Sequence, residues 1–450
     1  MKITRYIYTT LITATFALGG CNKDLDIKPV TSIDQGQAIK TSDDVQSTLN
    51  GTYSRLGSAN LYGGRIFLIP DLLATQTVID WDGTYADMTQ FVDQQVLNTN
   101  FYAESTWLVA YEAINGANNV LANLQLATND DEKARWEGEA RFIRGLLYFD
   151  LVRLYGKAWN DGDPNTNLGV PIVLTPTVKV DESSKVARAT VKQGYDQAIA
   201  DLTAAKTLLP DDNTFYASTY AASAILARLY LQQGNYKDAR DEASRVIKSN
   251  NYELNDKFSD EFPSSTKTHF DNTSEDIFAL QVTQQLGVNG LNEFYASSGN
   301  GGRGDIAVKD AFIEEYEAGD VRGEFFSASN RTNKFNNQYG NVHVVRLAEM
   351  YLIRAEANVR LGTSVGATAA SDVNIIRERA GLDPLAAVDL DSVLTERRHE
   401  LAFEGGFFLH DAKRLEADLI GEPWDSPKLI LPIPQREIIA NPKLIQNEGY

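Results

Sequence analysis

The sequence predicts an all-α protein in which tetratricopeptide-like helix hairpins stack into a superhelix, with long decorating loops and little strand. Three observations predict this fold. The segments 137–156, 218–234 and 343–362 each repeat apolar residues at helical spacing and end at a glycine. A second helical pattern follows the middle segment almost at once. Alanines occupy its contact positions, so two helices can approach closely, as in the tetratricopeptide hairpin.

The third segment shows the clearest apolar face. Steps of three and four residues place five side chains on one side of a helix: Val345, Ala348, Leu352, Ala355 and Val359. Glu356 and Arg360 lie four residues apart on another face and can form an ion pair there.

The middle hairpin carries the boundary signals of two helices. Asn235 is placed to cap the helix that begins at Tyr236, because its side chain can accept from the first free backbone N–H groups. Gly156, Gly234 and Gly362 each follow a predicted helix, and we expect each to adopt the left-handed conformation that ends it.

Further helices and the connecting loops complete the expected fold. Three more helical patterns flank the hairpins, at 104–127, 191–210 and 364–381. The spacing between hairpins is irregular, so we expect large inserted loops at 57–103, 157–190 and 250–342.

The first residues have the layout of an export signal. Lys2 and Arg5 precede an uncharged and largely apolar stretch at 6–18, and residues 19–20 are glycines before Cys21. Cys21 is the only cysteine of the chain, so it cannot form an internal disulfide. Residues 18–21, "LGGC", resemble a bacterial lipobox, so we expect residues 1–20 to be a lipoprotein signal peptide and Cys21 to carry the lipid anchor. The alternative is an ordinary signal peptide with a chance cysteine nearby.

The charge limits the ligands. The 450 residues carry a formal net charge of −19, and a chain this acidic is poorly suited to nucleic acid or other polyanions. Neutral or cationic ligands are the natural expectation. No long apolar run follows the signal, so the sequence predicts no membrane-spanning helix.

Motifs along the whole chain resemble one family. The resemblance rests on their order and joint spacing, and they read "CNKDLDIKPVTSI" (21–33), "LNGTYSRL" (49–56), "ARFIRGLLYFDLVRLYG" (140–156), "GVPIV" (169–173), "NTSEDIFALQ" (272–281), "GDVR" (319–322), "VRLAEMYLIRAEANVRLG" (345–362), "ERRHELAFEGG" (396–406) and "LPIPQREIIANPKLIQNEGY" (431–450). Together they resemble the SusD/RagB outer-membrane nutrient-binding lipoproteins of Bacteroidetes. One departure is that Phe407 and Phe408 stand where the family commonly has an Arg-aromatic pair.

The resemblance implies a fold and a role. It implies four tetratricopeptide-like helix pairs in a single domain over 21–450, with an N-terminal SusD-like region at about 21–250 and a C-terminal region at about 270–450. It implies a non-enzymatic lipoprotein that faces the cell exterior, captures oligosaccharide and delivers it to a TonB-dependent SusC-like barrel transporter. Peptide capture, as in RagB-like members, is the alternative ligand class. No cofactor is implied.

Catalytic signals are weak. "HELAFE" begins at His399 but lacks the second histidine of a zinc-protease helix, and "GNGGRGD" (299–305) lacks the strand–turn–helix context of a dinucleotide loop. A glycoside hydrolase needs two carboxylates held across a sugar, and a chain with 61 acids always offers some pair. A peptide-binding scaffold is the third hypothesis, although the large loops favour a site built from insertions.

Two loops hold the candidate ligand residues. Sugars expose apolar C–H faces that stack on aromatic rings, and hydroxyls that pair with planar polar groups. Residues 71–87 and 292–305 offer that mixture, with candidates Asp71, Asp80, Trp81, Tyr85, Tyr295, Asn300 and Arg303. We expect the two loops to converge on one exposed face with Trp81 as the stacking platform. The alternative for Trp81 is a buried loop anchor, and Trp107 and Trp136 are expected in the core.

Overall fold

The computed structural model describes residues 39–264, 268–285 and 287–450. Residues Thr41–Tyr450 form one compact unit. The expected signal peptide and Cys21 lie outside the described residues.

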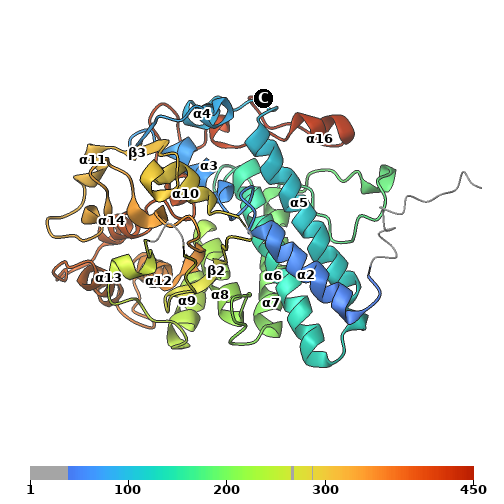
Figure 1. Cartoon of the computed structure of the whole chain (residues 1–450), viewed down its shortest axis with the longest axis horizontal. Helices are drawn as coiled ribbons and strands as arrows, with labels where there is room; N and C mark the ends of the chain where they lie inside the picture. The colour runs from blue at the N-terminus through green and yellow to red at the C-terminus, as the bar shows by residue number, and fades with distance from the viewer. Residues whose placement is uncertain (1–38, 265–267, 286) are drawn as a thin grey trace, which may run out of the picture. The chain divides into compact units, whose positions relative to one another are not determined.

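The prediction of an all-α fold built from helix hairpins is confirmed. Eight helices pack each against the next along the chain, so that neighbours in sequence are neighbours in space (Figure 1). They are α2 (Ser42–Leu56), α5 (Phe101–Ala122), α6 (Asp130–Tyr155), α7 (Val191–Leu208), α8 (Thr219–Gln232), α9 (Tyr236–Lys248), α12 (Leu347–Leu361) and α13 (Ala369–Arg379).

The long connections contain short elements of their own. Two antiparallel pairs of strands lie in them: β1 (Ile79–Trp81) with β3 (Ile306–Val308), and β2 (Asp276–Leu280) with β4 (Val342–Arg346). The shorter helices are α3 (Arg65–Ala74), α4 (Ala86–Val92), α10 (Gly290–Tyr295), α11 (Asp310–Ile313), α14 (Leu390–Glu400), α15 (Phe407–Leu415) and α16 (Gln435–Ala440). The expected loops at 57–103 and 250–342 are therefore folded insertions.

Several helix ends agree with the sequence signals. Asn235 accepts a hydrogen bond from the backbone N–H of Asp238 at 3.4 Å and caps α9 as predicted. Gly362 ends α12 in the left-handed conformation, with a φ of +63°, and Gly234 follows α8 with a φ of +71°. Arg360 donates to Glu356 at 2.8 Å, which confirms that pair.

Two boundary predictions are wrong. Gly156 has a φ of −121°, so it does not end α6 in a left-handed turn. A Cβ there would lie 2.9 Å from the carbonyl oxygen of Val152 and 3.3 Å from that of Leu168, so close packing explains the glycine. The helix expected at 343–362 begins only at Leu347, because Val345 belongs to β4 and pairs with β2.

The apolar face predicted from the sequence lies in the core. Leu352 is fully buried against Ala348, Ile376 and Leu401. Trp107 and Trp136 are buried as expected. In the part of the chain that the structure describes, no helix combines the length and the apolar character of a membrane span.

Candidate ligand-binding site

The β1–β3 ladder joins the two candidate segments. Ile79 pairs with Val308 and Trp81 with Ile306, although more than 220 residues separate them in the sequence. Beyond the ladder, the backbone N–H of Asp82 donates to the carbonyl oxygen of Asp305 at 2.8 Å. The backbone therefore brings residues 79–85 and 293–305 to one place. Figure 1 shows β3 beside α10.

Trp81 is half-buried at the centre of this junction. Its indole Nε1 donates to Thr89 Oγ1 at 3.0 Å, and its ring stacks on Phe294 with centroids 6.2 Å apart at 29°. Gly83 lies against the indole, since a Cβ there would be 2.2 Å from Cζ2. Contacts with Thr89, Phe294 and Gly83 therefore fix the ring in place, and part of it stays accessible.

Tyr85 and Arg303 form the second part of the junction. The guanidinium Cζ of Arg303 lies 4.3 Å from the Tyr85 ring centroid, a cation–π distance. Arg303 also donates to Thr84 Oγ1 at 3.1 Å and to Asp305 Oδ2 at 2.8 Å. Arg303 is exposed, and its hydrogen bond with Asp305 raises its pKa further, so it stays cationic.

Two exposed carboxylates flank Trp81 in the sequence. The side chain of Asp80 is 63% exposed, and its Oδ1 lies 3.5 Å from Lys309 Nζ. Asp82 is exposed as well. The Tyr85 hydroxyl donates to Glu293 Oε1 at a long 3.5 Å. Trp81 and Tyr85 both pack against Phe294, and Arg303 lies over the Tyr85 ring, so we call Trp81, Tyr85 and Arg303 the aromatic junction. Asp80 precedes Trp81 on β1, and its side chain therefore points to the other face of the strand.

Asp71 and Tyr295 are placed differently from the sequence expectation. Asp71 lies in α3 rather than in a loop, and both residues are about 1% exposed. The Tyr295 hydroxyl donates to Asp71 Oδ2 at 3.0 Å, and burial raises the pKa of Asp71 well above its usual value. Because the pair is enclosed, it supports the segments from inside and offers no surface to a ligand in this structure.

Asn300 lies at the half-buried base of the glycine-rich turn. Its carbonyl oxygen accepts from the Asn292 side chain at 3.1 Å, and Asn292 also donates to the carbonyl of Phe335 at 2.6 Å. Gly301 and Gly304 adopt positive φ angles of +85° and +69° on either side of Arg303. The turn is therefore fixed by its backbone and presents Arg303 outward.

Several contributors were missed by the sequence analysis. Tyr102 packs edge-on against Tyr85, with centroids 6.5 Å apart, and Arg65 lies over the Tyr102 ring at 4.7 Å. Glu293 accepts from the Tyr85 hydroxyl, and Asp305 accepts from the Arg303 guanidinium, so these two carboxylates help to orient the junction. Tyr102 belongs to the first turn of α5, and no local pattern distinguishes it from a core residue of that helix.

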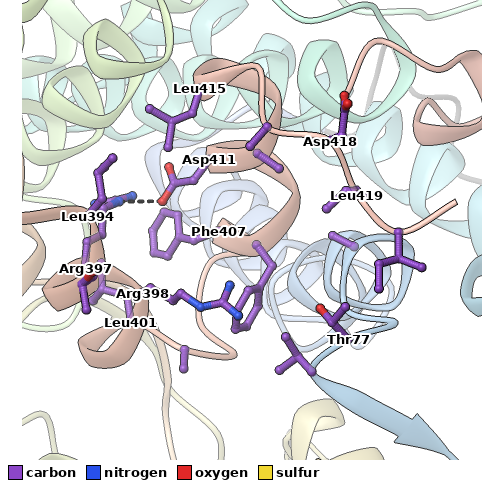
Figure 2. Close-up of a pocket in the computed structure, with 18 residues that line it drawn as sticks. Thr77, Leu394, Arg397, Arg398, Leu401, Phe407, Asp411, Leu415, Asp418 and Leu419 are labelled. Atoms are coloured by element: carbon purple, nitrogen blue, oxygen red, sulfur yellow. Dashed lines mark hydrogen bonds and ion pairs between the residues drawn. The ribbon is translucent and has the colours of Figure 1, made fainter. Parts of the chain in front are cut away.

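A cavity of about 370 Å³ lies between α14, α15 and the end of α3 (Figure 2). Arg397 donates to Asp411 at 2.7 Å at one edge, and Arg398 and Phe407 border it. Most of the wall is apolar, formed by leucine, isoleucine, alanine and phenylalanine side chains.

One buried cluster has the residue types of a metal site. Glu261, Asp276 and His343 place one ligand atom each within 4.8 Å of one another. His343 Nδ1 donates to Asp276 Oδ1 at 2.6 Å and lies 3.2 Å from Glu261 Oε1. A protonated histidine between two carboxylates accounts for this arrangement without a metal.

Comparison with protein families gives two matches that cover most of the chain. A family model described as "Starch-binding associating with outer membrane" matches residues 25–231. The model of the SusD family matches residues 166–419, more than half of the chain.

Individual proteins agree with this result. SusD-like protein P2 of Formosa agariphila is 26% identical, over 98% of this chain and 99% of its own. A SusD superfamily crystal structure from Bacteroides thetaiotaomicron has a TM-score of 0.80 at 27% identity and covers 91% of this chain and 100% of its own. A putative sugar binding protein from Bacteroides vulgatus has a TM-score of 0.81 at 27% identity, with 92% and 99% covered. With its helix-hairpin fold and these end-to-end matches, the chain belongs to the SusD family.

Proposed function

We propose that this protein captures oligosaccharide at the cell surface and that the aromatic junction binds the ligand. One observation supports the proposal: the β1–β3 ladder joins two distant segments, in which Trp81 and Tyr85 both pack against Phe294 and the exposed Arg303 lies over Tyr85. Membership of a family whose relatives include a putative sugar binding protein supports the ligand class.

The chemistry of the junction suits a neutral sugar. Aromatic rings offer stacking surface to the C–H faces of a pyranose. Carboxylates accept hydrogen bonds from sugar hydroxyls and the guanidinium of Arg303 donates to them, so both kinds of partner are present. Because the exposed Asp80 and Asp82 flank Trp81 in the sequence, the site is less favourable for a polyanion.

The rest of the proposed role concerns attachment and delivery. Cys21 carries the lipid that holds the protein on the outer face of the outer membrane. The captured sugar passes to a TonB-dependent SusC-like barrel. Family membership supports both statements, and the protein itself is a binding protein rather than an enzyme.

A binding screen tests the proposal. The purified full-length protein in detergent is run in native gels that contain amylopectin, laminarin, arabinoxylan or galactomannan, and reducing ends are measured after incubation with each. We expect retardation by at least one polysaccharide and no release of reducing ends. Release of reducing ends would indicate a hydrolase. Binding of a casein digest, with no polysaccharide bound, would indicate peptide capture.

A further inference from the structure

A second cavity lies far from the aromatic junction in sequence. It measures about 300 Å³, within the range of small-ligand sites, and opens between the α7–α8 connection, the residues after α9, and β2. Its wall is formed by Asp211, Asp212, Asn213, Thr214, Phe215, Tyr216, Ser218, Asn251, Tyr252, Asn272, Asp276, Ile277 and Phe278. None of these is a lysine or an arginine, in contrast to the apolar cavity of Figure 2, which Arg397 and Arg398 border.

Phe215 is held at the rim of this cavity with about half of its surface exposed. The preceding residue, Thr214, has a φ of +56°, which is unfavourable for a β-branched residue. A solvent-exposed phenylalanine and a strained threonine are both unfavourable in a free loop. Strain of this kind persists only where the surroundings enforce it, and it is concentrated at functional sites.

Contacts of the neighbouring residues hold the Thr214 backbone in this conformation. The Asn213 side chain donates to Glu139 Oε1 at 3.1 Å and to the carbonyl oxygen of Ala217 at 2.9 Å. The Tyr216 ring packs on Tyr53 with centroids 4.8 Å apart. The backbone N–H of Thr214 donates to Asp212 Oδ1 at 2.9 Å. The connection is therefore rigid on its inner side and presents Phe215 outward.

The polar groups of the wall are suited to hydroxyl groups. Asp211, Asp212 and Asn251 are exposed, and the Asn251 side-chain amide makes no hydrogen bond with any residue that the structure describes. Amides both donate and accept, and carboxylates accept, so a polyhydroxylated ligand finds both kinds of partner. The acidic rim and the absence of cationic lining residues argue against an anionic ligand.

We propose that this cavity is a second binding site for neutral glycan, with Phe215 as the stacking ring and Asp212 and Asn251 as hydrogen-bond partners. The proposal rests on the proposed function, since it assigns the same ligand class to a separate site. Two sites on one protein raise the apparent affinity for a long polysaccharide, because binding at one site increases the effective concentration at the other.

Calorimetric titration counts the sites. The full-length protein in detergent is titrated with a tetrasaccharide. This tetrasaccharide is taken from the polysaccharide that retards the protein in the native gels. If none of the four polysaccharides retards it, tetrasaccharides of all four are titrated. We expect two binding events for the wild type, with one of them weakened in Phe215→Ala and in Asn251→Ala and the other weakened in Trp81→Ala. Apparent affinity for the polysaccharide should fall at least about 5-fold in Phe215→Ala. The control is Ile439→Ala, which truncates another exposed apolar side chain in α16.

The outcomes separate the two sites. One binding event in the wild type, weakened in Trp81→Ala and unchanged in both cavity variants, overturns the second site and leaves the proposed function intact. One binding event that is weakened only in the cavity variants supports the second site and contradicts the aromatic junction. No binding of any tetrasaccharide overturns both. Melting curves confirm folding, and Asn251→Ala removes an exposed side chain, so it tests the cavity even where Phe215→Ala is unstable.

Discussion

His343 carries its positive charge because two buried carboxylates surround it. Burial alone lowers the pKa of His343, but Asp276 and Glu261 outweigh that effect and raise it to about 9. The histidine lies on β4 and Asp276 on β2, so this ion pair joins the two strands. Its contribution to the stability of the fold therefore depends on pH.

Replacing this histidine should be most harmful at low pH. The folded-state pKa exceeds the unfolded value near 6.5, so the stabilisation is complete below pH 6.5 and is lost as the pH rises through about 9. The difference in unfolding free energy between wild type and His343→Gln should therefore shrink by about 3 kcal/mol between pH 6 and pH 10, at about 1.4 kcal/mol for each pKa unit. Denaturant melts at both pH values measure it. An equal loss at both would show that His343 is neutral in the folded protein.

Single residues also show why the site could be predicted only in part. The sequence shows which residue types lie near the junction. It does not show whether each side chain faces the solvent or the protein interior. Asp71 and Tyr295 are residue types typical of a sugar site. They nevertheless form a buried pair, because α3 and α10 turn them toward the interior. Tyr102 is buried as its helical pattern indicates, but that pattern does not show that it packs against Tyr85.

At the scale of elements, close helix contacts depend on small residues. Gly194 of α7 is buried against α6, where a Cβ would lie 2.4 Å from Val152 Cγ2. Gly51 of α2 is exposed and has no atom within 4 Å of such a Cβ. Both glycines are in helix interiors, where alanine is ordinarily more favourable.

The two glycines should respond to alanine with opposite signs. Gly51→Ala should stabilise the protein by about 0.5–1 kcal/mol, the usual gain in helix propensity. Gly194→Ala should destabilise it by about 1–3 kcal/mol, because the added methyl group overpacks against a stiff valine. Thermal melts of both variants test this. A Gly194→Ala variant more stable than the wild type would mean that α6 and α7 are not closely packed.

The elements also show what the sequence pattern can and cannot predict. Helix faces repeat every three to four residues, so α8, α9 and α12 are visible locally. The sequence pattern predicts a helix from residue 343, but residues 342–346 pair with β2, so α12 begins only at Leu347. Strand β2 lies more than 60 residues earlier, and a local pattern carries no information on so distant a partner. The β1–β3 ladder also joins segments far apart in the sequence, so no local pattern predicts it. A glycine is needed at position 156 because neighbouring backbone atoms leave no room for a Cβ, and its φ angle is not the reason.

At the scale of the whole molecule, the proposed role requires attachment to the membrane. Cys21→Ala should move the protein from the membrane fraction to the soluble fraction, because acyl chains anchor by about 0.8 kcal/mol for each buried methylene group. Fractionation of cells that contain no SusC-like transporter measures this. A variant that stays in the membrane fraction would refute the anchor.

Calorimetric titration of Trp81→Ala shows whether the aromatic junction binds sugar. The ligand is the oligosaccharide selected by the gel screen. The control is Trp159→Ala, another half-buried tryptophan, whose ring lies 5.0 Å from Tyr195 and outside the junction. Because both rings are half-buried, both variants should melt somewhat below the wild type.

Stacking on an aromatic ring contributes about 1–3 kcal/mol, by analogy with bases on aromatic side chains. Trp81→Ala should therefore weaken binding at the junction roughly 5- to 150-fold, whereas Trp159→Ala should bind as the wild type does. If the folded Trp81→Ala protein binds the oligosaccharide with unchanged affinity and stoichiometry, the aromatic junction is not the ligand site.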